Sequence, residues 1–158
     1  MPRHEPPPAF ELERHPFFWL TQTIGSRDRR LTRELKGFGL RVPEWRVLAS
    51  LYARRRCSMS ELADLATIDR TTLTRTVDRM ARAGWVTRLS DAKDLRVTRL
   101  ALTGAGERLF ARIWPTVERI NRTAVEGLPA GAVDMLRWTL ERMKANLDHG
   151  LAADERAA

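Results

Sequence analysis

The sequence predicts a mainly α-helical fold that contains one small β-hairpin. Three observations lead to this prediction. Apolar residues recur at helical spacing in six segments, two short alternating runs stand between the fourth and the fifth segment, and a glycine, a proline or a capping residue marks most of the borders. The chain has 158 residues, which suits one compact domain, or one domain with an added oligomerisation element.

Two helices are predicted in the first third of the chain. Residues 1–9 contain four prolines and are expected to form an irregular arm. The first predicted helix spans residues 16–36, because apolar side chains recur there every three or four positions with one gap, and Gly37 follows as a stop signal. The second helix begins at Pro43, since proline is tolerated in a first turn, and ends near residues 54–56.

The middle of the chain predicts two helices in close succession. Ser58 and Glu61 have the spacing of a capping box and open a short helix. Asp69 is a suitable cap for the next helix, which Gly84 ends. Leucine, valine and methionine lie on one side of this second helix, whereas threonine and arginine lie on the others. The pair therefore predicts a braced helix with a polar, basic face.

A hairpin and two long helices complete the predicted order. Two strand-like runs surround a polar turn at residues 90–95. Thr103 then opens a long helix, in which Pro115 is expected to produce a kink because it removes a main-chain hydrogen bond. A last helix follows at residues 129–147. A short helix, a polar-faced helix and a hairpin in this order predict a winged helix-turn-helix.

The charge of the chain indicates a polyanionic partner. The formal net charge is +8, and residues 70–99 alone carry eight basic side chains against three acidic ones. Such a field attracts nucleic acid or an anionic membrane surface. No apolar run approaches the roughly 20 residues that cross a bilayer, and no apolar signal region opens the sequence. Because Cys57 is the only cysteine, an internal disulfide is excluded, and a cytoplasmic protein is predicted.

Other classes of function find little support. The three histidines lack the spacing of metal ligands and there is no CxxC motif, so neither a metal nor a cofactor is predicted. The sequence shows no nucleophile–base–acid set and no phosphate-binding glycine loop, which argues against an enzyme. A membrane-surface protein is a weaker alternative: the helix at 16–36 is amphipathic, but its apolar stripe is better used in a dimer.

Two stretches carry a family resemblance. They are SELADLATIDRTTLTRTVDRMARAGWVTR and SDAKDLRVTRLALTGAGERL, which place a Ser-x-Leu-Ala helix at 60–63, a Thr-Arg pair at 74–75, an Asp-x-Arg wing at 94–96 and a Leu-Thr-x-x-Gly helix start at 102–106. With the flanking helices, the segment from Leu40 to about Leu147 resembles the MarR family of bacterial transcription regulators. The resemblance implies a winged helix-turn-helix that binds double-stranded DNA.

The polar helix carries the side chains that we expect to touch DNA. A major groove admits one helix, and short donors and forked guanidinium groups suit its base edges, while the helix N-terminus favours phosphate. Base or phosphate contacts are predicted for Arg75 and Thr72. Phosphate or groove contacts are predicted for Arg70, Thr71, Thr74 and Arg79. The competing interpretation is an ordinary solvated surface of a helix.

The wing supplies the other predicted DNA contacts. An arginine at a hairpin tip can enter a narrow minor groove, and the resemblance implies that Arg96 does so, oriented by Asp94. Lys93 is expected to contact phosphate or to be a solvated charge, as are Arg88 and Arg99.

The helices outside the winged module carry more apolar surface than such a module can bury, which predicts a homodimer on a palindromic operator. The resemblance also implies a dimer, and a small effector that binds between the dimer helices and the DNA-binding lobe. An aromatic acid or its coenzyme A thioester is predicted, because the candidate lining residues are aromatic or basic. They are His15, Trp19, Arg27, Trp45, Arg46 and Trp114.

The predicted organisation is an arm at 1–9, an N-terminal dimerisation helix at 10–41, a winged helix-turn-helix at 42–102, C-terminal dimerisation helices at 103–150 and a tail at 151–158. Two alternatives to an effector-controlled repressor stay open. Cys57 follows three arginines that would favour a thiolate, so a redox-sensing repressor is one of them, although a passive cysteine competes because there is no resolving cysteine. An architectural DNA-binding protein without an effector is the other.

Overall fold

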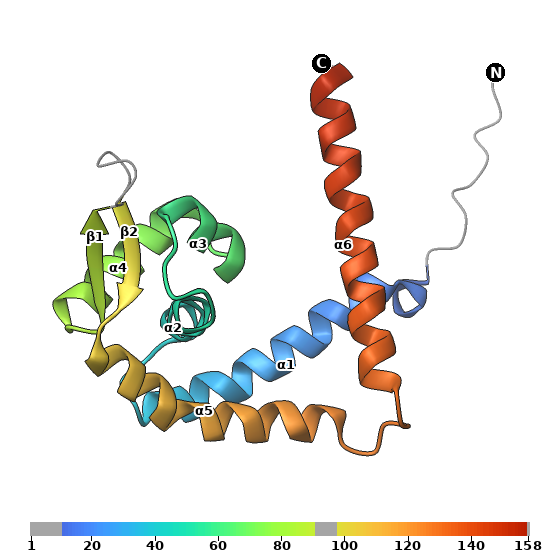
Figure 1. Cartoon of the computed structure of the whole chain (residues 1–158). Helices are drawn as coiled ribbons and strands as arrows, with labels where there is room; N and C mark the ends of the chain where they lie inside the picture. The colour runs from blue at the N-terminus through green and yellow to red at the C-terminus, as the bar shows by residue number, and fades with distance from the viewer. Residues whose placement is uncertain (1–10, 91–97, 158) are drawn as a thin grey trace, which may run out of the picture. The chain divides into compact units, whose positions relative to one another are not determined.

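The computed structural model describes residues 11–90 and 98–157, and its elements follow the predicted order (Figure 1). The described elements are a 3-10 turn η1 (Leu12–Arg14), the helices α1 (Pro16–Lys36), α2 (Val42–Arg54), α3 (Met59–Ala66) and α4 (Arg70–Arg82), the strands β1 (Val86–Ser90) and β2 (Thr98–Leu102), and the helices α5 (Gly104–Val125) and α6 (Ala132–Ala157). The predicted fold class, mainly α with one hairpin, is confirmed.

The helix caps form as the sequence predicts. The Ser58 hydroxyl accepts a hydrogen bond from the Glu61 N–H at 3.2 Å, and the Glu61 carboxylate accepts one from the Ser58 N–H at 2.7 Å. The Asp69 carboxylate accepts from the Thr72 N–H at 2.8 Å, which caps α4. These bonds satisfy N–H groups that the first turn of a helix leaves without a partner, so they fix where α3 and α4 begin.

Helix α5 continues through Pro115.

One apolar core holds together the first of two compact units, Met1–Ile120. Helix α1 contributes Leu31 and Leu35 from its second half only. Further large side chains with almost no exposed surface come from α2, α3, α4, β2 and α5, among them Val47, Leu48, Leu51, Leu62, Leu73, Val77, Met80, Leu100 and Ile113. The first half of α1 instead exposes Phe17, Trp19 and Ile24.

The hairpin is antiparallel and also pairs with a segment outside it. Its register runs from Val86 opposite Leu102 to Ser90 opposite Thr98. The segment between α2 and α3 adds a further backbone pair, because Cys57 donates to the Leu100 carbonyl at 3.1 Å and accepts from the Leu100 N–H at 2.7 Å. The loop that precedes α3 therefore lies against the outer side of β2.

The second compact unit, Asn121–Ala158, contains the end of α5 and all of α6. Its apolar side chains remain uncovered within this single chain: Leu128, Val133, Met135, Leu136, Trp138 and Leu147 are 46% to 63% exposed. A helix that keeps so many large apolar side chains at its surface is typical of an interaction surface. Among the described residues, no helix is both long enough and apolar enough to span a membrane.

Candidate nucleic-acid interface

Helix α4 is oriented by its buried side. Leu73, Thr76, Val77 and Met80 point into the core, and the Thr76 hydroxyl donates to the Thr72 carbonyl at 2.8 Å. The turn from α3 is tight, because Thr67 adopts a left-handed conformation with φ 51° and ends α3. Since four inward positions fix the rotation of the helix, the remaining positions must face outward.

The outward face of α4 gathers the predicted DNA contacts at its N-terminal half. All five of these side chains are exposed, namely those of Arg70, Thr71, Thr72, Thr74 and Arg75. Within the described part of the chain, the guanidinium groups of Arg70 and Arg75 have no protein partner. Two free cations and three threonines beside the positive end of a helix form a surface suited to phosphates and base edges.

Arg79 differs from the other predicted contacts because its guanidinium already has protein partners. Its Nε lies 2.9 Å from a carboxylate oxygen of Glu44, and its Nη2 donates to the Gly39 carbonyl at 3.1 Å. Glu44 has no exposed surface. Arg79 is therefore held by partners within the protein while 41% of its side chain stays exposed, and its phosphate or groove contact stays a prediction.

Two ion pairs attach the wing to the helices. Arg88 on β1 donates to Asp78 on α4 at 2.5 Å, and Arg99 on β2 donates to Glu61 on α3 at 2.7 Å. Each arginine therefore connects the wing to a helix through a partly exposed ion pair, and a phosphate contact of either stays a prediction. The Ser58 N–H lowers the pKa of Glu61 below its usual value, and the Ser58 hydroxyl and Arg99 lower it further.

The tip of the wing, residues 91–97, lies outside the described residues. It contains Lys93, Asp94 and Arg96, whose roles stay predictions.

The residues predicted to line the effector site fall into two groups. Trp45 and Trp114 belong to a cluster of stacked rings, and the other four lie on α1 or close to it. Trp45 is buried and stacks on Phe110 of α5 with ring centroids 5.5 Å apart, and Phe110 also stacks on Tyr52 at 3.8 Å and on Trp114 at 5.9 Å. Tyr52 and Trp114 are 38% and 41% exposed. The result is a layer of parallel rings across α2 and α5 that is open to solvent on one side.

The other four effector candidates lie along α1 or face it. Arg46 donates to Asp28 at 2.7 Å, and Arg27 lies 3.5 Å from the same carboxylate, so both arginines contact an acid of the protein. Trp19 is 57% exposed and its indole N–H donates to the Glu13 carbonyl at 2.8 Å. His15 precedes α1 as its N-cap residue.

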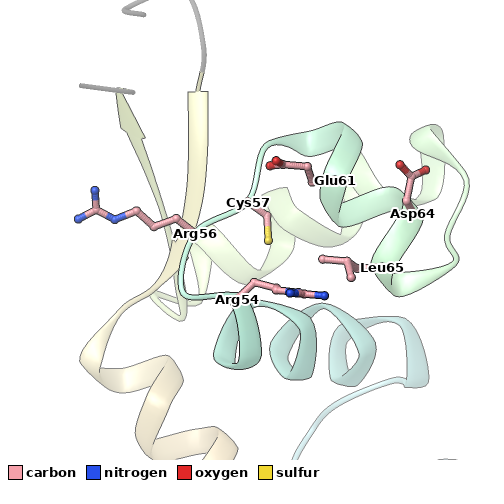
Figure 2. Close-up of a pocket in the computed structure, with 6 residues that line it drawn as sticks. All are labelled: Arg54, Arg56, Cys57, Glu61, Asp64 and Leu65. Carbon is pink, nitrogen blue, oxygen red and sulfur yellow. The ribbon is translucent and has the colours of Figure 1, made fainter. Parts of the chain in front are cut away.

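Cys57 does not have the environment expected of a reactive thiol. Its side chain is buried, at 2% exposed, below a surface pocket of about 390 Å³ (Figure 2). Figure 2 shows the sulfur turned toward Arg54 and Leu65. Burial raises the pKa of the Cys57 thiol, the Glu61 charge raises it further, and Arg54 and Arg99 oppose them with smaller effects. The net direction is opposite to the predicted thiolate.

Glu44 is the residue at this interface that the sequence analysis did not single out. Its spacing to Leu48 and Leu51 places it on the apolar stripe of α2. A charged residue at an inward helical position indicates a buried partner, and this signal was present in the sequence. Among the described residues, no cluster of histidine, cysteine, aspartate and glutamate could hold a metal ion.

A short helix, a tight turn and an exposed cationic helix, flanked by a hairpin, define a winged helix-turn-helix DNA-binding protein. The sequence profile of the MarR family matches residues 40–98. The transcriptional repressor IacR from Pseudomonas putida is 32% identical over 139 residues, which cover 88% of this chain and 83% of the relative. The chain belongs to the MarR family and is a DNA-binding transcription regulator.

Solved structures support this assignment. A MarR-family transcriptional regulator from Silicibacter pomeroyi has a TM-score of 0.79 and 27% identity, over 86% of this chain and 92% of that one. A cysteine-to-serine mutant of MarR from Escherichia coli, complexed with operator DNA, has a TM-score of 0.69 and 25% identity, over 79% of this chain and 90% of that one. The family and these neighbours are transcription regulators rather than enzymes.

Proposed function

We propose that the protein is a homodimeric repressor that binds a palindromic operator and leaves it when a small aromatic acid, or the coenzyme A thioester of one, binds. The observation that carries the proposal is the outward face of α4, where Arg70 and Arg75 lie among three exposed threonines and have no partner among the described residues. IacR is named a repressor, and the similar MarR structure contains operator DNA, which supports the same activity here.

In the proposed docking, α4 enters the major groove and the wing follows the adjacent minor groove. Arg75 and Thr72 read base edges or hold phosphate, while Arg70, Thr71 and Thr74 hold the backbone of the DNA. Arg96 at the wing reaches the minor groove, with Asp94 orienting it and Lys93 near phosphate. One such module buries too little surface for a useful ratio of specific to non-specific affinity, so a second copy is required.

The dimer is proposed to form through the helices outside the winged module. Helix α6 exposes Met135 and Trp138, and the first half of α1 exposes Phe17 and Trp19. Burying apolar surface contributes about 25 cal/mol for each Å², and these side chains supply such surface without reducing the core of the first unit. Residues 10–41 and 103–150 are therefore proposed as the dimerisation segments.

The ring layer formed by Tyr52, Phe110 and Trp114 is the proposed contact for the effector. Parallel rings that are open on one side favour a further planar ring, and an offset stack contributes about 0.5–1.5 kcal/mol beyond its buried area. Arg55 lies over Tyr52, 5.5 Å from the ring centroid, and pairs with Glu107 at 3.3 Å; in the proposal it turns from Glu107 to the carboxylate of the effector. An effector releases DNA only if it binds more tightly to a dimer whose helices no longer match the operator.

A selection of binding sites from a random duplex library, followed by footprinting, tests the proposal. We expect a palindrome with half-sites about one helical turn apart, protected by a dimer. A panel of benzoates, phenylacetates and their thioesters should stabilise the protein in a thermal-shift assay and lower its affinity for the selected duplex. Equal affinity for selected and random duplexes would favour the architectural alternative, and release by peroxide but by no aromatic acid would favour redox control.

A further inference from the structure

The carboxylate of Glu44 is buried and depends on cations for its compensation. Its Oε2 accepts a hydrogen bond from the Arg41 N–H at 2.8 Å. Its Oε1 receives no hydrogen bond of good geometry, although Arg79 Nε lies 2.9 Å away and the Arg41 guanidinium 3.5 Å away. Because a buried charge is costly unless it is paired, Coulombic attraction to Arg79 is what makes this position of Glu44 tolerable.

The same guanidinium also holds the corner between α1 and α2. Arg79 Nη2 donates to the Gly39 carbonyl at 3.1 Å. Gly39 has φ +69°, and the next residue, Leu40, donates to the Leu35 carbonyl at 3.1 Å, which closes the end of α1. The planar fork of an arginine can bridge two acceptors in fixed directions, whereas the ammonium group of a lysine cannot. Arg79 thus joins α4 to the start of α2 and to the end of α1.

We propose that the Glu44–Arg79 pair is a clamp that sets the angle at which α4 is presented to DNA. In this inference, which rests on the proposed docking of α4, Arg79 is a positioning residue and contacts no phosphate. The clamp also ties α4 to the corner where α1 ends, so a displacement of that corner moves the helix that reads DNA.

The decisive variant is Glu44→Gln, because a side chain without exposed surface cannot itself touch DNA. Affinities are measured over a range of salt concentrations for two duplexes: one selected by the parent protein from a random library, and a shuffled duplex of the same length. We expect Glu44→Gln to bind the selected duplex at least tenfold more weakly. Binding of the shuffled duplex and the salt dependence should stay within experimental error of the parent.

Two further variants keep the test independent of folding. Arg79→Lys leaves a cation beside Glu44 but cannot also reach Gly39, so it should show the same loss of selectivity in a folded protein. The double variant Glu44→Gln/Arg79→Gln contains no buried carboxylate that has lost its cation. Its selectivity for the selected duplex should therefore equal that of Glu44→Gln alone. The matched control is Arg70→Ala. It should reduce the magnitude of the negative slope of log K against log salt by about 0.9, the value for one lost phosphate contact.

Two results would overturn the clamp. One is a folded Glu44→Gln protein that distinguishes the two duplexes as well as the parent does. The other is a double variant whose salt slope falls by about 0.9 below that of Glu44→Gln, because that result makes Arg79 a phosphate contact. A parent protein that binds no duplex at all would refute the proposed function itself, and the clamp with it.

Discussion

The carbonyl oxygen of Trp85 lies where a side chain on Gly106 would have to begin. A β-carbon on Gly106 would stand 2.2 Å from that oxygen and 3.1 Å from its carbon. The Thr103 N–H donates to the same oxygen at 3.0 Å, and the Thr103 hydroxyl donates to the Gly84 carbonyl at 2.6 Å. The base of the wing and the first turn of α5 therefore meet backbone to backbone, which only glycine permits at position 106.

Gly106→Ala is expected to destabilise the protein by about 1–3 kcal/mol, because the contact can be relieved only by moving backbone. The free energy of unfolding in urea measures this effect. Gly25→Ala is the matched control: a β-carbon there meets only the end of the Arg29 side chain, at 3.4 Å. Since alanine is the better helix former, Gly25→Ala should stabilise the protein by about 0.5–1 kcal/mol. Equal stability of the Gly106→Ala protein and the parent would contradict the close packing.

Arg75→Ala is expected to weaken binding to the selected operator by about 1–3 kcal/mol without unfolding the protein. The exposed guanidinium has no protein partner within the described chain, so its loss should leave the thermal midpoint unchanged. Arg96→Ala is expected to act likewise through the wing. Fluorescence anisotropy with a labelled duplex at moderate salt measures both. The control variant Arg112→Ala removes an equal charge from the exposed side of α5, and its affinity for the operator should be almost that of the parent. If Arg75→Ala and Arg96→Ala also bind the operator as the parent does, the proposed docking is refuted.

The cap of α4 should weaken in acid. The Thr72 N–H, followed by the Thr72 hydroxyl, lowers the pKa of Asp69 below its usual value. A carboxylate whose pKa is lower in the folded state stabilises the fold fully above its unfolded pKa, about 3.9, and ceases to do so as the pH falls through its folded pKa. Unfolding free energies of the parent and of Asp69→Asn, which caps without titrating, should therefore converge between about pH 5 and pH 2. A difference that does not change with pH would contradict this.

Met135→Asp combined with Trp138→Ser is expected to dissociate the dimer. Both side chains of α6 are more than 60% exposed in the single chain, at 63% and 62%, and a charge at a buried interface is costly. Analytical ultracentrifugation should show a monomer whose operator affinity has fallen at least tenfold. Leu65→Asp places the same charge on an exposed leucine of α3 and should leave the dimer intact. A parent protein that sediments as a monomer would refute the proposed assembly.

Cys57 should react slowly while the protein is folded. Burial raises its pKa, and only the thiolate attacks a disulfide reagent, so the reaction with an aromatic disulfide such as dithiobis(nitrobenzoate) at pH 8 should be far slower than in urea. A Cys57→Ser protein should bind the operator and respond to effector as the parent does. Rapid reaction of the folded protein, together with peroxide release that Cys57→Ser abolishes, would support the redox alternative.

Local chemistry was enough to predict several borders of the elements, but the last helix, predicted at 129–147, runs as α6 from Ala132 to Ala157. The capping box at Ser58 and the cap at Asp69 depend on residues three positions apart, so sequence spacing determines them. The same is true of the outward face of α4, because its buried side repeats at helical spacing. The ion pair and the hydrogen bond of Arg79 could not be predicted from sequence spacing, since its partners Glu44 and Gly39 lie outside α4, far away in the sequence.

Long-range packing also explains the other differences. The charges beside Cys57 in the sequence suggest a thiolate, but burial against β2 outweighs them. Arg46 was predicted to line the effector site, and only the fold shows that it also donates to Asp28 of α1. Trp45 and Trp114 were singled out separately, and only the fold shows that Phe110 stacks on both.

The backbone pair between Cys57 and Leu100 also bears on how the protein behaves when it is concentrated. A strand at the border of a sheet offers free donors and acceptors to the strands of other molecules, which leads to aggregation. Here the outward donor and acceptor of Leu100 are already satisfied from within the chain. The wing is thereby shielded at this point from intermolecular β-pairing, even in a concentrated solution.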